Sequence, residues 1–156
     1  MWWLAVASVL LGAALTVPFR HLWEVDEPRC AQAAREMVAS GQWLVPHLYA
    51  EPYTHKPPLF LWLEAVLQVV GSPWTAAAVL PSLLAFLGIA VLLPRLARAA
   101  GLPDETGRLA AVVLASSPLV PFLALAARMD MLLAFFHTLA LLMLARLIVP
   151  PAAAPA

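Results

Sequence analysis

Long apolar segments make up most of the chain and are separated by one extended polar stretch near the N-terminus. A nearly uncharged apolar run comes first, and the polar stretch of residues 20–73 follows it. An apolar run of about 18 residues is long enough to cross roughly 30 Å of hydrocarbon as a helix. The pattern therefore predicts four membrane spans, at residues 1–19, 74–95, 109–127 and 131–149.

The polar stretch contains two short helical patterns that we do not expect to cross the membrane. Residues 26–40 begin with Asp26, a residue typical of an N-cap, and are followed by Gly41, a typical helix stop. Residues 59–70 are apolar but carry Glu64. Both segments are too short to span and should lie along the interface. The predicted fold is thus an all-α integral membrane protein with about four transmembrane helices and two juxtamembrane helices in a large first outer loop.

Composition supports the membrane class and narrows the range of partners. The chain is 63% hydrophobic and only 12% charged, which leaves too little polar surface for a soluble domain of 156 residues. Its net charge is zero, so we expect membrane lipids and no nucleic acid as partners. A single cysteine excludes an internal disulfide and a cysteine-based zinc site.

The two ends of the chain have different patterns. Residues 1–19 have no basic region at their start and no clear cleavage site, so a retained helix is favoured over a cleaved signal peptide. Residues 150–156 contain only proline and alanine, and they are predicted to form a flexible tail.

Arginines indicate which side of the membrane each loop occupies. Three of them lie in or beside the loop of residues 95–108, which should therefore be cytoplasmic. If residues 59–70 do not cross, the polar stretch and Asp130 both lie outside. If that segment crosses, the arginine loop lies outside and Asp130 lies on the face opposite Asp26. The first arrangement fits the arginines, and we predict it.

Two aspartates are the main candidates for chemistry, because ionisable groups near membrane spans are costly and often functional. Asp26 opens a helix beside the first span, and Asp130 lies at the junction of the last two spans. Each also has a purely structural interpretation. Asp26 can cap its helix, and Asp130 can pair with Arg128 or cap the last helix.

Two cations accompany Asp26. Arg29 lies one helical turn later and can face the same site, or it can simply pair with Asp26. Lys56 precedes two prolines that fix its direction, or it extends to lipid headgroups. Two cations beside a carboxylate fit a phosphate-bearing ligand, and the carboxylate can act as a base toward a hydroxyl. The spacing of the histidines, including His55, matches no metal-binding pattern.

Three ordered motifs in the polar stretch resemble a known family. They read Trp23-x-x-Asp26-Glu27-x-Arg29, then Ala34-Arg35-Glu36-Met37-x-x-Ser40-Gly41-x-Trp43-Leu44-Val45-Pro46, then Pro52-Tyr53-x-x-Lys56-Pro57-Pro58-Leu59. These motifs are similar to the N-terminal region of polyprenyl-phosphate-dependent membrane glycosyltransferases of the GT-C fold. That group includes the aminoarabinose transferases of lipid A and the protein O-mannosyltransferases.

The resemblance implies roles for five residues. Asp26 matches the catalytic aspartate that activates the acceptor, and Glu27 completes the acidic pair in a supporting catalytic role. Arg29 and Lys56 match positions that bind the donor phosphate, and Asp130 matches the second acidic position. The implied reaction is inverting transfer of a sugar from a polyprenyl-phosphate carrier to a lipid or protein acceptor. It would take place on the outer face of a bacterial inner membrane.

The sequence also departs from the family pattern. The residue before Lys56 is often acidic in the aminoarabinose branch and is His55 here, which argues against aminoarabinose as the sugar. A divalent metal cofactor stays an open alternative, with Asp26 and His55 as candidate ligands. Family members have many more spans, so we expect a fragment, a truncated product or one half of a split enzyme, whose partner is the C-terminal half. A non-catalytic membrane subunit that binds lipid phosphate or a partner protein is the alternative function.

Overall fold

The computed structural model describes residues 2–23 and 25–149, and nearly all of its regular structure is helical. The elements are α1 (Trp2–Thr16), α2 (Asp26–Ser40), β1 (His47–Leu48), β2 (Glu51–Pro52), α3 (Pro58–Val69), α4 (Trp74–Ala99), α5 (Asp104–Ser116), α6 (Leu119–Ala124) and α7 (Asp130–Ile148). The two strands pair antiparallel as a small hairpin. The predicted all-helical fold class is confirmed, and the predicted tail lies outside the described residues.

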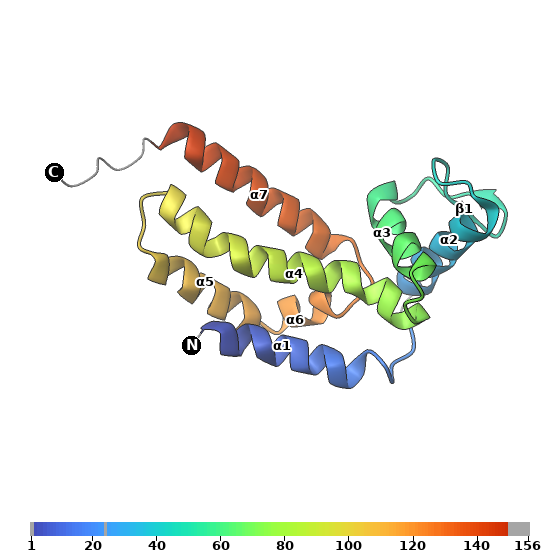
Figure 1. Ribbon diagram of the computed structural model, residues 1–156, viewed down its shortest axis with the longest axis horizontal. Coiled ribbons are helices and arrows are strands. Elements are labelled where there is room, and N and C mark those ends of the chain that lie inside the picture. Colours follow the sequence, from blue (N-terminus) through green and yellow to red (C-terminus); the bar gives the residue numbers. More distant parts are fainter. Residues whose placement is uncertain (1, 24, 150–156) are drawn as a thin grey trace.

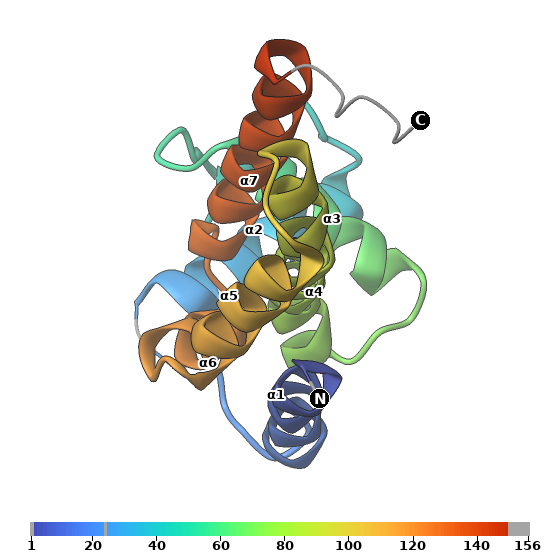
Figure 2. The same ribbon diagram turned by 90° about the vertical axis from the view of Figure 1, so that its left-hand side faces the viewer.

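Helices α1, α4, α5 and α7 run along the long axis of the molecule and form a bundle, as Figures 1 and 2 show. Helix α4 packs against α5 and α7, and α1 packs against α5. The core is made by apolar side chains from each of these helices, among them Val6, Phe86, Ala115 and Met131. Successive long helices alternate in direction, so the α1–α2 and α6–α7 connections lie at one end and the α4–α5 turn at the other (Figure 1).

Helices α4 and α5 approach each other closely at Gly107. A Cβ atom added to Gly107 would lie 2.4 Å from the Cα of Pro94, which is closer than atoms can approach. Glycine therefore allows the two backbones to touch at this crossing.

Within residues 2–23 and 25–149, two helices, α4 and α7, are long and apolar enough to cross a membrane. Helix α1 has 15 residues and is shorter than the predicted span 1–19. The expected single helix over 109–127 is wrong, since α5 begins at Asp104 and stops at Ser116, and the short α6 follows. The break lies at Ser117, which is extended with ψ 129° because the residue before a proline avoids the helical region. The four membrane crossings stay a prediction.

Helices α2 and α3 form a separate layer at one end of the bundle (Figure 1). Their own core includes Met37 from α2 and Phe60 and Leu61 from α3. The guanidinium of Arg35 lies 5.7 Å from the ring centroid of Trp74 and ties α2 to the start of α4. The start of α7 lies at this same end of the bundle. The predicted topology in which α3 does not cross the membrane requires this position.

Candidate functional site

Asp26 and Lys56 form an ion pair between the start of α2 and the loop before α3. The Nζ atom of Lys56 lies 3.0 Å from a carboxylate oxygen of Asp26. The hydrogen bond from Lys56 lowers the pKa of Asp26, and the same bond raises the pKa of Lys56. Both groups are therefore charged at neutral pH. Pro57 follows Lys56 in an extended conformation and leads directly into α3.

The capping role expected for Asp26 is wrong. Val25 occupies the N-cap position of α2, and its side chain makes no capping hydrogen bond. Asp26 is the first helical residue, and its carboxylate bonds to Lys56. Gly41 ends α2 as predicted, with a φ of 71° and its N–H bonded to the carbonyl of Met37.

A cavity of about 510 Å³ opens beside the ion pair. It is lined by Asp26, Arg29, Leu48, Tyr49, Glu51, Pro52, Tyr53, His55 and Lys56. Arg29 is exposed and makes no ion pair or hydrogen bond with any residue in 2–23 or 25–149, so the expected alternative of an Asp26–Arg29 pair is not observed. Two carboxylates, Asp26 and Glu51, and two cations, Arg29 and Lys56, thus line the same cavity.

The β1–β2 hairpin forms one wall of this cavity. Tyr49 and Ala50 at its turn have positive φ values of 55° and 68°, which are costly for residues other than glycine. Their N–H groups donate to the carboxylate of Glu36 at 3.0 and 3.4 Å. Gln32 donates to the same carboxylate at 2.9 Å. Helix α2 therefore holds the hairpin in its strained conformation.

Asp130 lies outside the cavity lining but close to the same charges. Its carboxylate accepts a hydrogen bond from Nε of Arg128 at 3.0 Å, so the predicted Arg128–Asp130 pair is confirmed. The positive charge of Arg128 in turn contributes to the lowered pKa of Asp26, after the stronger effect of Lys56. The positive charge of Arg128 therefore acts on both aspartates, although Asp130 does not line the cavity.

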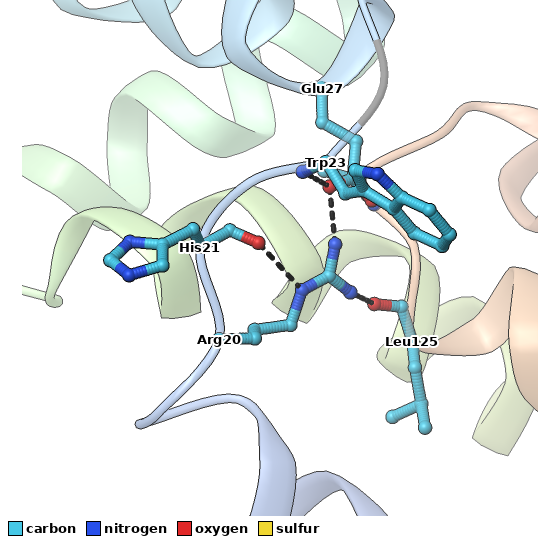
Figure 3. A network of polar contacts seen from close by, with 6 residues as sticks. Arg20, His21, Trp23, Glu27 and Leu125 are labelled. Carbon is cyan, nitrogen blue, oxygen red and sulfur yellow. Dashed lines mark hydrogen bonds and ion pairs between the residues drawn. The ribbon is translucent and has the colours of Figure 1, made fainter.

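Glu27 points into the protein and does not line the cavity, although it neighbours Asp26. Only 3% of Glu27 is exposed. Its carboxylate accepts hydrogen bonds from the side chain of Arg20, the N–H of Trp23 and the N–H of Ala127, as Figure 3 shows in part. Arg20 was missed by the sequence analysis. The available signal was its position as a lone cation directly after an apolar span.

Glu64 is a second buried acid that the sequence analysis treated only as a polar residue in α3. It is fully buried, and neither carboxylate oxygen has a hydrogen-bond partner within the described residues. Burial raises its pKa well above the usual range, and the negative charge of Glu27 adds to this shift. Burial also raises the pKa of the neighbouring Cys30 thiol to about 12, so this thiol stays protonated.

The residues at the site do not fit a metal ion. Within the described ranges, no group of three or more histidine, cysteine, aspartate or glutamate side chains is placed to hold one. The carboxylate of Asp26 bonds to Lys56, and the ring of His55 lies 5.8 Å from the ring of Tyr53.

Comparison with known proteins identifies the family. The family model for dolichyl-phosphate-mannose-protein mannosyltransferase matches residues 1–153. The chain belongs to this mannosyltransferase family. The resemblance seen in the three motifs is thereby confirmed.

Relatives of this mannosyltransferase-family chain include bacterial enzymes that are named for another sugar. Over 67 residues it is 43% identical to an undecaprenyl phosphate-alpha-4-amino-4-deoxy-L-arabinose arabinosyl transferase of Pseudomonas savastanoi pv. phaseolicola. That match covers 43% of this chain and 13% of the relative. Over 79 residues it is 38% identical to transferase 2 of the same description from Proteus mirabilis, covering 51% of this chain and 14% of the relative.

Solved structures match almost the whole chain. ArnT from Cupriavidus metallidurans bound to undecaprenyl phosphate gives a TM-score of 0.78 at 28% identity. The apo form of the same protein gives a TM-score of 0.76 at 29% identity. Each match covers 96% of this chain and 28% of the ArnT chain. This member of the mannosyltransferase family therefore spans little more than a quarter of the ArnT structure.

Proposed function

We propose that the protein transfers a sugar from a polyprenyl-phosphate carrier to a hydroxyl group of a lipid or protein acceptor. Asp26 acts as the base, and the site faces the outer side of a bacterial inner membrane. The observation that carries the proposal is the single cavity onto which Asp26, Arg29 and Lys56 all open. The family match and the likeness to an ArnT structure bound to undecaprenyl phosphate support this choice of donor.

Arg29 and Lys56 bind the donor phosphate. The guanidinium of Arg29 is exposed on the cavity and can contact two phosphate oxygens at once. Lys56 is bonded to Asp26 before the donor arrives. When its ammonium turns toward the phosphate, Asp26 loses part of the interaction that lowers its pKa. Donor binding thus makes Asp26 a stronger base.

The reaction is a displacement at the anomeric carbon of the sugar. The oxygen of the acceptor hydroxyl forms the new bond to that carbon, and its proton passes to Asp26. The bond between the anomeric carbon and the phosphate oxygen breaks, and the polyprenyl phosphate leaves with the electron pair. Attack from the face opposite the phosphate inverts the configuration. Arg29 and Lys56 stabilise the charge that develops on the leaving phosphate.

Asp26→Asn tests this function. The amide cannot accept the proton, so we expect turnover of the full-length protein in proteoliposomes to fall by about 100-fold or more. Transfer of a radiolabelled sugar from a polyprenyl-phosphate donor is the measurement. Asp104→Asn is the matched control, because Asp104 is also the first residue of a helix and is paired with an arginine, at 3.1 Å. Unchanged turnover in Asp26→Asn would overturn the assignment of Asp26 as the base, whereas no sugar transfer by the unsubstituted protein would instead favour a non-catalytic subunit that binds lipid phosphate.

A further inference from the structure

Glu27 joins parts of the chain that are far apart in the sequence. Its Oε2 atom accepts hydrogen bonds from the side chain of Arg20 and, at 2.6 Å, from the N–H of Trp23. Its Oε1 atom accepts a hydrogen bond at 2.9 Å from the N–H of Ala127, 100 residues away. One buried carboxylate thus connects the α1–α2 loop, the first turn of α2 and the α6–α7 connection.

Arg20 makes a second link between the same two connections. Besides Glu27, its guanidinium donates to the carbonyl oxygen of Leu125, as Figure 3 shows. The Arg20 side chain is 23% exposed, whereas that of Glu27 is only 4% exposed, so this ion pair is largely shielded from water. Hydrogen bonds between charged groups in such surroundings hold their geometry firmly.

A third contact fixes the other side of the α6–α7 connection. The hydroxyl of Ser82, a fully buried residue of α4, donates to the carbonyl oxygen of Arg128 at 2.7 Å. The backbone is therefore held at Leu125, Ala127 and Arg128, immediately before Asp130. At the opposite end of this network, Glu27 directly follows Asp26 in α2.

We propose that Glu27, assisted by Arg20, is a positioning residue that sets the separation between Asp26 and the Arg128–Asp130 pair. This inference rests on the proposed sugar transfer, and it replaces the catalytic role expected for Glu27. A catalytic carboxylate needs an accessible oxygen within reach of the substrate. Both oxygens of Glu27 are occupied by donors, and the residue is absent from the lining of the Asp26 cavity.

Kinetics separate positioning from donor binding. In Glu27→Gln an NH2 group replaces one of the two accepting oxygens. Since an amide nitrogen cannot accept a hydrogen bond, at least one of the three hydrogen bonds is lost. Small misplacement of catalytic groups costs about 10- to 100-fold in rate, and we expect kcat of the full-length protein to fall by that factor. The KM for the polyprenyl-phosphate donor should stay within about twofold, because Arg29 and Lys56 are untouched. Glu105→Gln is the matched control, because Glu105 is likewise the second residue of a helix but lies at the opposite end of the bundle.

A distance measurement tests the same inference without relying on catalysis. Spin labels at Ala39→Cys and His137→Cys, both exposed, report the distance between α2 and α7. The native Cys30 is buried and should not react. We expect a narrow distance distribution in the otherwise unchanged protein and in Glu105→Gln, and a broader one in Glu27→Gln. Arg20→Lys keeps the charge but reaches less far, and it serves as the second variant if Glu27→Gln does not fold.

The outcomes are distinct. Lower kcat, unchanged donor KM and a broader distribution support the positioning role. Unchanged kcat overturns it, and so does a lower kcat with an unchanged distribution, which would return Glu27 to the chemistry itself. If the unsubstituted protein transfers no sugar, the proposed function fails. The distance distribution then decides alone whether Glu27 holds α2 and α7 in register.

Discussion

The ionisation of Asp26 depends mainly on one neighbour, Lys56. Their hydrogen bond of 3.0 Å is the largest cause of the lowered pKa of Asp26, and the charges of Arg128 and Arg29 contribute less. Above its pKa, Asp26 is ionised and can accept a proton from an acceptor hydroxyl. Below that pKa it is protonated and inactive. Lys56 thus widens the pH range over which the base is available.

Lys56→Gln should move the acidic limb of the activity profile to higher pH. Without the ammonium, the pKa of Asp26 rises, so protonation removes the base at a pH where the unsubstituted protein is still active. The measurement is kcat/KM for the donor as a function of pH, because this ratio reports the ionisation of Asp26 in the donor-free protein, where Lys56 is bonded to it. Arg29→Gln should move the limb less, since Arg29 is the smallest of the charge effects. If the acidic limb of the activity profile does not move in Lys56→Gln, the group whose protonation causes that limb is not Asp26.

At the scale of elements, the packing of α2 on α3 carries an electrostatic cost at Glu64. This fully buried carboxyl interacts electrostatically with Cys30 and Glu27 of α2 and has no hydrogen-bond partner among the described residues. Its raised pKa means that the folded protein binds a proton that the unfolded chain releases near its ordinary pKa of 4.5. Folding stability contributed by this group is therefore present at acidic pH and declines as pH rises from there toward the raised pKa.

Glu64→Gln should remove this decline. The amide has nearly the same shape and does not titrate, so the variant should lose less stability than the unsubstituted protein between acidic and neutral pH. The slope that Glu64 contributes is at most about 1.4 kcal/mol per pH unit. Thermal unfolding of the purified protein in detergent at a series of pH values measures it, with the exposed Glu51→Gln as control. Equal slopes in all three proteins would show that Glu64 does not titrate as proposed.

Helix ends were predictable where the signal is local. Gly41 stops α2, and the prolines after Lys56 start α3, because each acts through the conformation of its own backbone. The break at Ser117 carried the same kind of signal in the following proline, but the continuous hydrophobicity around it favoured one long span. The order of motifs grouped Asp26, Arg29 and Lys56, and all three line one cavity, while their roles in catalysis and phosphate binding stay predictions.

At the scale of the whole molecule, the contacts that join the two acidic segments were not predictable. Arg20 and Leu125 are 105 residues apart, and Glu27 meets a backbone N–H, which every residue except proline offers. No pattern along the chain selects such partners. They result from the way α1, α4 and α6 pack, which depends on small residues such as Ala124 and Ala127 at their contacts.

The most basic short loop of the chain lies at one end of the bundle, and its position predicts the orientation of the whole molecule. Helices α2 and α3 with the candidate site lie at one end, and the α4–α5 turn lies at the other beside Arg95, Arg98 and Arg108. Basic residues in short loops stay on the cytoplasmic side, whereas acidic residues have little influence. The turn should therefore face the cytoplasm, and the site should face outward.

Single cysteines at the two ends test this orientation in intact cells. Thr54→Cys lies in the exposed loop before α3, and Glu105→Cys lies at the start of α5, where the side chain is 78% exposed. A membrane-impermeant maleimide should label Thr54→Cys directly and Glu105→Cys only after the membrane is permeabilised. The buried Cys30 provides the unlabelled background in the parent protein. Labelling of Glu105→Cys from outside would reverse the orientation and place the Asp26 cavity on the cytoplasmic face, where the proposed outer-side transfer could not occur.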